Sequence, residues 1–244
     1  MTATGYPPVP DRYRGVWSRT LLQTPTVRDE TTAVHWLQTS HHHGDLRVPA
    51  ADGRPATPAD CQGFSGLTQV VQHADIEVCT WHRQIDLQPP GLHPDAGHIH
   101  FETPDRLIET GVHGDYLEVW ERLPGSTGRF VVLESKPPAP AARLLVAGDF
   151  LLRLRPRALA WPAGTRPGDT LSEVASRHPA DATALLAFEI RFGVLRGDML
   201  SIASSTHAAL AGTMENCAIR RTSPGEAVVS ESAGSTGWRV VEWD

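Results

Sequence analysis

Lysine is nearly missing from this sequence, since Lys136 is the single lysine among 22 basic residues and the others are arginine. Together with abundant alanine, proline and glycine, this bias indicates a GC-rich bacterial genome. Positive charge is also in short supply, because the formal net charge is −6. A general nucleic-acid binder needs a basic surface to displace counterions from phosphates. The composition therefore argues against nucleic acid as a partner.

Paired cysteines and long apolar runs are missing as well. Cys61, Cys79 and Cys217 are odd in number and lack CxxC spacing, which indicates neither a disulfide framework nor a structural zinc site. No apolar run approaches the roughly 18–20 residues that cross a bilayer. The N-terminal segment has no basic stretch followed by an apolar one. We therefore expect no signal peptide, no membrane partner and a cytoplasmic protein.

The main pattern that the sequence does have is period-2 alternation, interrupted by Gly, Pro and Asp turns. About eight strands are expected in the first half of the chain, a density typical of a small up-and-down barrel. They are expected at residues 15–22, 31–38, 45–49, 63–71, 76–87, 97–102, 106–111 and 116–123.

The second half repeats this pattern and adds one helix. Strands are expected at residues 129–135, 143–156, 184–195, 199–205, 217–222, 226–232 and 237–244, and the segment 184–195 shows the clearest alternation. Thr170 and Glu173 form a capping-box pattern, which predicts a helix to about His178, before Pro179. We place the division within residues 124–128. The prediction is an all-β fold of two tandem antiparallel barrels, residues 1–125 and 126–244.

Several short segments resemble a known family. They are WLQT (36–39), DLRVP (45–49), CTWHRQIDLQPPG (79–91), LEVWERL (117–123) and GWRVVEWD (237–244). They are similar to segments of a lipocalin-like family built of two similar barrels. It includes a fungal protein known mainly as a kinase-interacting partner, together with bacterial relatives. The resemblance implies tandem lipocalin-like, calycin-type barrels and brings no established chemistry with it.

The expected strand 76–87 carries one residue that needs a partner. Its core face is marked by apolar side chains at Cys79, Trp81, Ile85 and Leu87, and Arg83 lies on that same face. An unpaired charge inside a barrel is strongly destabilising. The planar guanidinium could bind the carboxylate, phosphate or carbonyl group of a ligand. The alternatives are an internal ion pair, for example with Glu102 or Glu118, or an arginine at the rim that reaches solvent.

Four of the seven tryptophans fall in the first half, at positions 17, 36, 81 and 120. Aromatic side chains usually fill a core, but they also suit a cavity for a partly hydrophobic ligand. The residues expected to line such a pocket are Trp36, Trp81, Arg83, His100 and Tyr116, with His35 as a further polar candidate. The second half is expected to be a filled, supporting barrel with aliphatic side chains at Leu144, Leu186, Phe188, Ile190, Leu200 and Ile202.

GHIHFE (97–102) has the spacing of a metal site. Residues two apart on a strand face the same way, about 6.8 Å between Cα atoms, so His98 and His100 could ligate one ion. The alternate positions Gly97, Ile99 and Phe101 form an apolar face. We therefore expect the histidines to point away from the core, and we predict no metal site and no cofactor.

Other histidines leave alternatives open. His113 or the run His41–His43 could supply a third metal ligand, but the run lies between two expected strands and is interpreted as a polar turn. Residues 188–212 are also similar in rhythm to the last strands of fatty-acid-binding-protein-like and nitrobindin-like barrels, some of which bind haem. His207 is the histidine close to that hairpin.

Motifs for nucleophilic and nucleotide chemistry are missing, including GxSxG, GxGxxG and a P-loop lysine. The leading prediction is the binding of a small, partly hydrophobic metabolite in the N-terminal barrel, with Arg83 anchoring a polar group. One alternative is a cofactor-free isomerase, cyclase or hydrolase in the same cavity, with His100 or Glu118 as acid or base. Another is a protein-interaction scaffold with filled barrels. No pattern specifies the oligomeric state.

Overall fold

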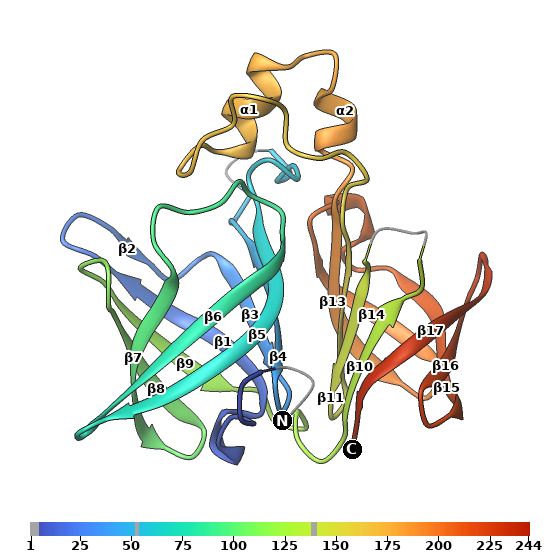
Figure 1. The fold of residues 1–244 in the computed structure, drawn as a ribbon, viewed down its shortest axis with the longest axis horizontal. Helices are drawn as coiled ribbons and strands as arrows, with labels where there is room; N and C mark the ends of the chain where they lie inside the picture. The colour runs from blue at the N-terminus through green and yellow to red at the C-terminus, as the bar shows by residue number, and fades with distance from the viewer. Residues whose placement is uncertain (1–4, 52–53, 138–140) are drawn as a thin grey trace.

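Two closed antiparallel β-barrels stand side by side, and a short helical segment lies above both (Figure 1). The computed structural model describes residues 5–51, 54–137 and 141–244. The prediction of an all-β fold of two tandem barrels is confirmed. None of the helices in these ranges is long and apolar enough to cross a membrane.

The N-terminal barrel is a meander that closes where β1 pairs with β9. Its strands are β1 (Gly15–Gln23), β3 (Ala33–Gln38), β4 (His42–Val48), β5 (Gln62–His73), β6 (Ile76–Asp86), β7 (Asp95–Thr103), β8 (Arg106–Gly111) and β9 (Leu117–Arg122). The two-residue β2 (Arg28–Asp29) pairs with the end of β1. The short helix η1 (Asp11–Tyr13) lies below the barrel in Figure 1 and buries Tyr13 in its core.

The C-terminal barrel closes in the same way, through β10 and β17. Its strands are β10 (Phe130–Ser135), β11 (Arg143–Ala147), β12 (Phe150–Arg155), β13 (Glu189–Arg196), β14 (Met199–Ser205), β15 (Met214–Ser223), β16 (Glu226–Glu231) and β17 (Gly234–Trp243). The helices are α1 (Leu171–Arg177), α2 (Ala182–Leu185) and the short η2 (Ala208–Leu210).

The sequence patterns predicted α1 correctly and two of the strands incorrectly. Thr170 caps α1 with the expected capping box, and Glu173 closes it. The single strand expected at 143–156 is the hairpin β11–β12, which turns at Gly148 with a positive φ of 56°. The strand expected from residue 184 begins at 189, because residues 182–185 form α2 instead. An apolar run does not distinguish a strand from a buried helical turn.

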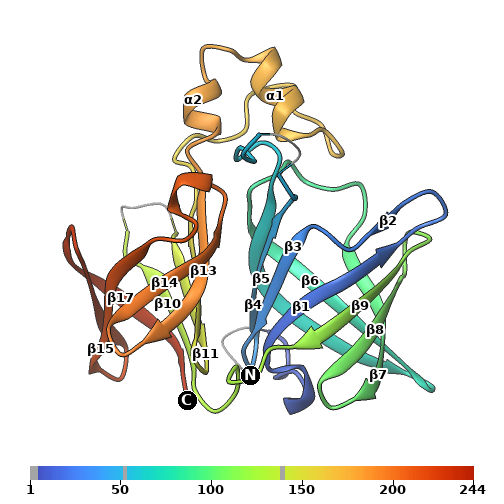
Figure 2. The same cartoon turned by 180° about the vertical axis from the view of Figure 1, so that it is seen from behind.

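A shared apolar core joins the two barrels. Strands β3 and β4 contact β11, β13 and β14, and both views show these strands facing one another (Figures 1 and 2). Along β11, Leu144 and Val146 face the barrel interior, while Leu145 and Ala147 face the shared core. Strands buried on both faces read as continuous apolar runs. Phe188, Ile190 and Phe192 belong to this shared core. The alternation along this strand predicted that these side chains fill the C-terminal barrel, and that prediction is wrong.

The histidine run is part of this interface and not a polar turn. His42 begins β4 and is buried beside Glu242 of β17, with which it pairs. The same carboxylate accepts hydrogen bonds from the backbone amides of Ser40 and His41. His43 is fully buried and bonds to Thr68 at 3.0 Å. The contacts of Glu242 cross from one barrel to the other and fix their relative position, whereas the bond between His43 and Thr68 lies within the first barrel.

His35 lies in the same interface, where its ring stacks on Phe192 with centroids 4.0 Å apart. Burial lowers the pKa of His35 to about 4, whereas an unfolded histidine titrates near about 6.5. Between these two pKa values, His35 is protonated in the unfolded chain and neutral in the folded protein. The free energy of unfolding therefore falls as the pH drops from about 6.5 towards 4, by as much as about 3 kcal/mol from this residue.

His35→Phe keeps a ring against Phe192 and removes the titration. Between pH 7 and pH 4.5, we expect urea unfolding to show a loss of stability in this variant that is smaller than in the wild type by about 2 kcal/mol. Equal losses in the two proteins would mean that His35 is not the group responsible.

Candidate functional site

The interior of the N-terminal barrel changes from apolar to charged along its axis. Its lower part is filled by Tyr13, Trp17, Val34, Cys79, Ile99 and Leu107, with Trp36, Trp81 and Trp120 in the same core. At the other end, where β4 ends and β5, β7 and β9 begin, the side chains around the opening include Arg19, Arg47, Asp95, Tyr116 and Glu118. This end is the mouth of the barrel.

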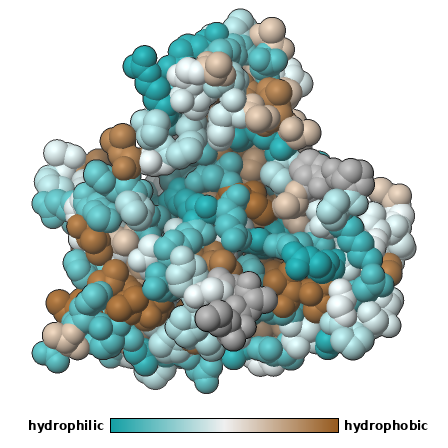
Figure 3. Space-filling view, in the orientation of Figure 1, coloured by the Kyte–Doolittle hydropathy of each residue, from teal (hydrophilic) through white to brown (hydrophobic). Residues whose placement is uncertain are grey.

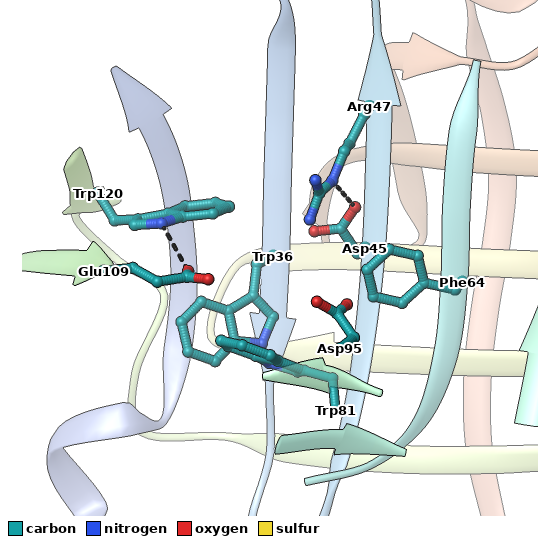
Figure 4. A pocket seen from close by; sticks show the side chains of 8 residues that line it. All are labelled: Trp36, Asp45, Arg47, Phe64, Trp81, Asp95, Glu109 and Trp120. Carbon is teal, nitrogen blue, oxygen red and sulfur yellow. Dashed lines mark hydrogen bonds and ion pairs between the residues drawn. The ribbon is translucent and has the colours of Figure 1, made fainter. Parts of the chain in front are cut away.

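Two hollows adjoin at this end. The mouth encloses about 440 Å³. Below it lies a hollow of about 10 Å³, which we call the floor and which has room for about one water molecule. The floor is lined by Trp36, Asp45, Arg47, Phe64, Trp81, Asp95, Glu109 and Trp120 (Figure 4). Arg47, Asp95 and Glu109 line both hollows, so the floor adjoins the mouth.

The tryptophans give the floor rigid walls. Trp36 meets Trp81 and Trp120 edge to face, with centroids 5.3 Å and 5.8 Å apart, a favoured geometry for aromatic pairs. The Trp36 indole N–H donates to the Gln38 side chain at 3.2 Å. The rings are therefore held by one another and by hydrogen bonds, which preserves the space above them.

Glu109 is the unusual group of the floor. Its side chain accepts hydrogen bonds from the Tyr116 hydroxyl at 2.8 Å and from the Trp120 indole at 3.1 Å, and the residue is only 4% exposed. Burial raises its pKa well above the usual value, and the charges of Glu118 and Asp95 add to the effect. Within the described part of the chain it forms no ion pair. A carboxyl group in this setting favours the neutral, protonated form.

The other charges around the site are paired. Arg19 binds Glu118 at 2.6 Å and Asp29 at 3.0 Å. Arg47 binds Asp45 at 2.9 Å, although burial still raises the pKa of Asp45.

Arg83 binds Asp95 at 2.7 Å and Asp86 at 3.1 Å, and its guanidinium stacks 3.5 Å from the centroid of Phe64. The Arg83 side chain is 29% exposed. It is thus an arginine at the rim with its own carboxylate partners, which are neither Glu102 nor Glu118. The expected face is only partly right. A bulge opposite Gly66 shifts the register between Arg83 and Ile85, and Ile85 and Leu87 point into the core between the barrels.

Gly66 permits this bulge, since a Cβ atom there would lie 1.8 Å from the His82 carbonyl oxygen.

In GHIHFE (97–102), the residue that belongs to the site is Gly97, and His98 and His100 do not. A Cβ atom at Gly97 would lie 2.6 Å from both Cγ and Oε1 of Glu109, so the absent side chain makes the space that Glu109 occupies. His98 and His100 alternate with the buried Ile99, and His100 is exposed on the outer face of β7. Their expected outward orientation is confirmed, and for the same reason His100 does not line the cavity.

Of the remaining residues that the sequence suggested for the site, four line the cavity and two lie elsewhere. Trp36 and Trp81 line the floor, and Tyr116 and Glu118 line the mouth. His35 lies between the barrels, and His207 precedes η2, outside both hollows. Across the described ranges, no cluster of three or more His, Cys, Asp or Glu side chains has the arrangement of a metal site.

Sequence reasoning did not assign Asp45, Arg47, Phe64, Asp95 or Glu109 to the pocket, although Glu109 was among the available acid–base groups. The sequence did contain a signal for Glu109. In the expected strand RLIETG (106–111), Leu107 and Glu109 lie on the same face, so a charged side chain shares the face of a core residue.

A larger cleft of about 1040 Å³ lies between the barrels, beside the loop 88–94 and the segment 156–161. Figure 3 shows this face of the molecule hollowed below the helices. Its arginines are already engaged. Arg157 donates to the carbonyl oxygens of Leu87 and Leu185 and stacks on Trp161. Arg157 thus ties the first barrel to the helical segment, and the cleft offers a ligand few unpaired groups.

The chain matches no protein-family model and no curated protein. A solved structure is similar, that of the uncharacterized protein YLR301w from Saccharomyces cerevisiae. The likeness covers 94% of this chain and 98% of that one, with a TM-score of 0.59 and 12% sequence identity. At this identity it shows the tandem-barrel fold and nothing about activity. Membership in the lipocalin-like family and the bacterial relatives stay predictions.

Gly97→Ala tests the space beneath Glu109. The added methyl group is expected to lower the free energy of unfolding by about 1–3 kcal/mol, the usual cost of overpacking. In a Glu109→Ala background the clashing atoms are gone, so the same change should cost far less. Urea unfolding of the four proteins measures both values, with Gly225→Ala as the control because a Cβ there meets nothing within 4 Å. An equal cost in both backgrounds would assign Gly97 another role.

Proposed function

We propose that the protein binds a small, partly hydrophobic metabolite at the mouth of the N-terminal barrel. The observation that carries this proposal is the mouth of about 440 Å³, which adjoins a floor walled in part by three tryptophans. Its size falls within the range of about 300–1,000 Å³ typical of ligand sites. Aromatic walls with a few convergent polar groups are also usual in such sites.

The C-terminal barrel supports this site without contributing to it. Of the described residues, those that line the mouth come from no further along the chain than Glu118, and those that line the floor from no further than Trp120. We therefore assign ligand binding to the N-terminal barrel, residues 1–125, and a supporting role to residues 126–244. Arg83 lines neither the mouth nor the floor and adjoins the site only through its ion pair with Asp95, so the anchoring role shifts to groups inside the mouth.

A second candidate function is acid–base catalysis in the same cavity. Glu109 and Glu118 are direct cross-strand partners on β8 and β9, where side chains lie about 5 Å apart. Glu118 is held by Arg19, whereas Glu109 favours its protonated form. Two carboxyl groups with such different surroundings are typical of an acid and its charged neighbour. Glu109 thereby replaces His100 as the candidate acid of a cofactor-free isomerase, cyclase or hydrolase.

Thr32→Trp tests the proposed binding site. Thr32 lines the mouth, so an indole there should fill it and exclude a ligand. Ala33→Trp is the matched control, because Ala33 is exposed and on the opposite face of the chain. Native mass spectrometry of the purified proteins with a metabolite library should show a bound small molecule in the wild type and the control but not in Thr32→Trp.

Binding that survives in Thr32→Trp would move the site elsewhere, with the cleft between the barrels as the next place to search. If no compound binds the wild type, the filled-barrel scaffold becomes the better interpretation.

A further inference from the structure

The floor of the N-terminal barrel has an excess of acidic groups. Asp45, Asp95 and Glu109 line it, against the single base Arg47. Arg47 is paired with Asp45, and Asp95 with Arg83 at the rim. Glu109 is the carboxyl group without a cation. It is more than nine-tenths buried, and Figure 4 shows its carboxyl group held by Trp120 beside the central space.

The aromatic walls of the floor also favour a positively charged ligand. Trp36, Trp81, Trp120 and Phe64 surround the floor. The face of an aromatic ring attracts cations, and tryptophan does so most strongly. An anionic group placed here would face both the rings and three carboxyl groups. The floor is therefore complementary to a positive charge.

The size of the floor restricts which cation fits. A hollow of about 10 Å³ admits a group the size of a water molecule, and a primary ammonium group is similarly compact. A quaternary ammonium group is too large. The carboxyl groups do not form a metal-binding cluster among the described residues, and four of the eight residues that line the floor are aromatic. An organic cation fits this composition better than a metal ion does.

We propose that the ligand of the N-terminal barrel carries a primary ammonium group, which enters the floor and displaces the proton of Glu109, while the rest of the molecule occupies the mouth. This inference rests on the proposed function and names its ligand class. The bond that breaks is the O–H bond of the Glu109 carboxyl group. The proton passes to solvent, and the ammonium group donates hydrogen bonds to the resulting carboxylate.

The proton balance gives the inference a pH dependence. Charged and titratable side chains from every neighbouring element lie around Glu109. They are Arg19, Asp45, Arg47, Cys79, Asp95, Tyr116 and Glu118. The free protein holds the proton because burial raises the pKa of Glu109. A cation favours the charged carboxylate. Binding therefore releases a proton and tightens as the pH rises, by up to about tenfold per pH unit below the pKa of Glu109 in the free protein.

The probe is n-butylammonium, with 1-butanol and butyrate as the neutral and anionic compounds of the same length. Titrations are followed through the indole N–H signals of the ¹⁵N-labelled full-length protein, because the Trp120 N–H is bonded to Glu109. Between pH 5.5 and 8, where the amine stays charged, we expect n-butylammonium to bind at least tenfold more tightly than 1-butanol, with an affinity that rises with pH. Tetramethylammonium should bind more weakly than n-butylammonium.

Glu109→Gln should weaken n-butylammonium binding at least tenfold at pH 8 and abolish the pH dependence. Glu102→Gln removes one carboxylate from the exposed outer face of the same barrel and should leave both unchanged. If Glu109→Gln fails to fold, Asp45→Asn provides a second test. It removes a charge from the floor without touching the bonds of Glu109, and it should also weaken binding.

Two outcomes overturn the inference. Either n-butylammonium leaves the tryptophan signals unchanged, or 1-butanol binds as tightly as the amine. If a library compound without an amine still binds the wild type and is excluded by Thr32→Trp, the proposed function stands and only the ligand class is wrong. If neither the probes nor the library bind, both proposals fail together.

Discussion

An eight-stranded barrel encloses a space that side chains nearly fill, and the arrangement of the N-terminal barrel follows from that limit. Indoles and aliphatic groups occupy its lower part, closed from below by η1. The mouth remains open, and many of the described residues that line it are charged. Each charge that is kept inside such a narrow space needs a partner nearby, which explains the ion pairs of Arg19 and Arg47, and that of Asp95 with Arg83 at the rim.

The second barrel leaves this mouth accessible. Its strands β11, β13 and β14 pack against the flank formed by β3 and β4, so the contact is lateral. Small residues bring the strands close, since a Cβ at Gly63 would lie 2.2 Å from Ile190 and one at Gly44 would lie 2.8 Å from Leu152. The apolar core between the barrels therefore stabilises both while it covers neither the mouth nor the floor.

The fold was largely predictable from the sequence, and the site was predictable only in part. Period-2 alternation and the capping box at Thr170 are local signals, and they identified the barrels and α1. Trp36, Trp81 and Tyr116 were found because aromatic residues on inward faces are conspicuous. The faces of Ile85 and Phe192 were not predictable, because a bulge and a second barrel decide them. Glu109 was not assigned to the site because its place there depends on Gly97, a neighbour in space that lies 12 residues away in the chain.

The pairing of Gly97 with Glu109 bears on the choice between a binding protein and a filled scaffold. A buried carboxyl group costs stability, and apolar residues of similar volume usually replace buried charged groups without loss. A glycine within a strand also weakens it. A barrel that served only as a scaffold would be more stable with a larger residue at 97 and an apolar one at 109. Both unfavourable choices occur at the base of the open mouth, next to the tryptophans. Stability costs gathered at one place are typical of functional sites.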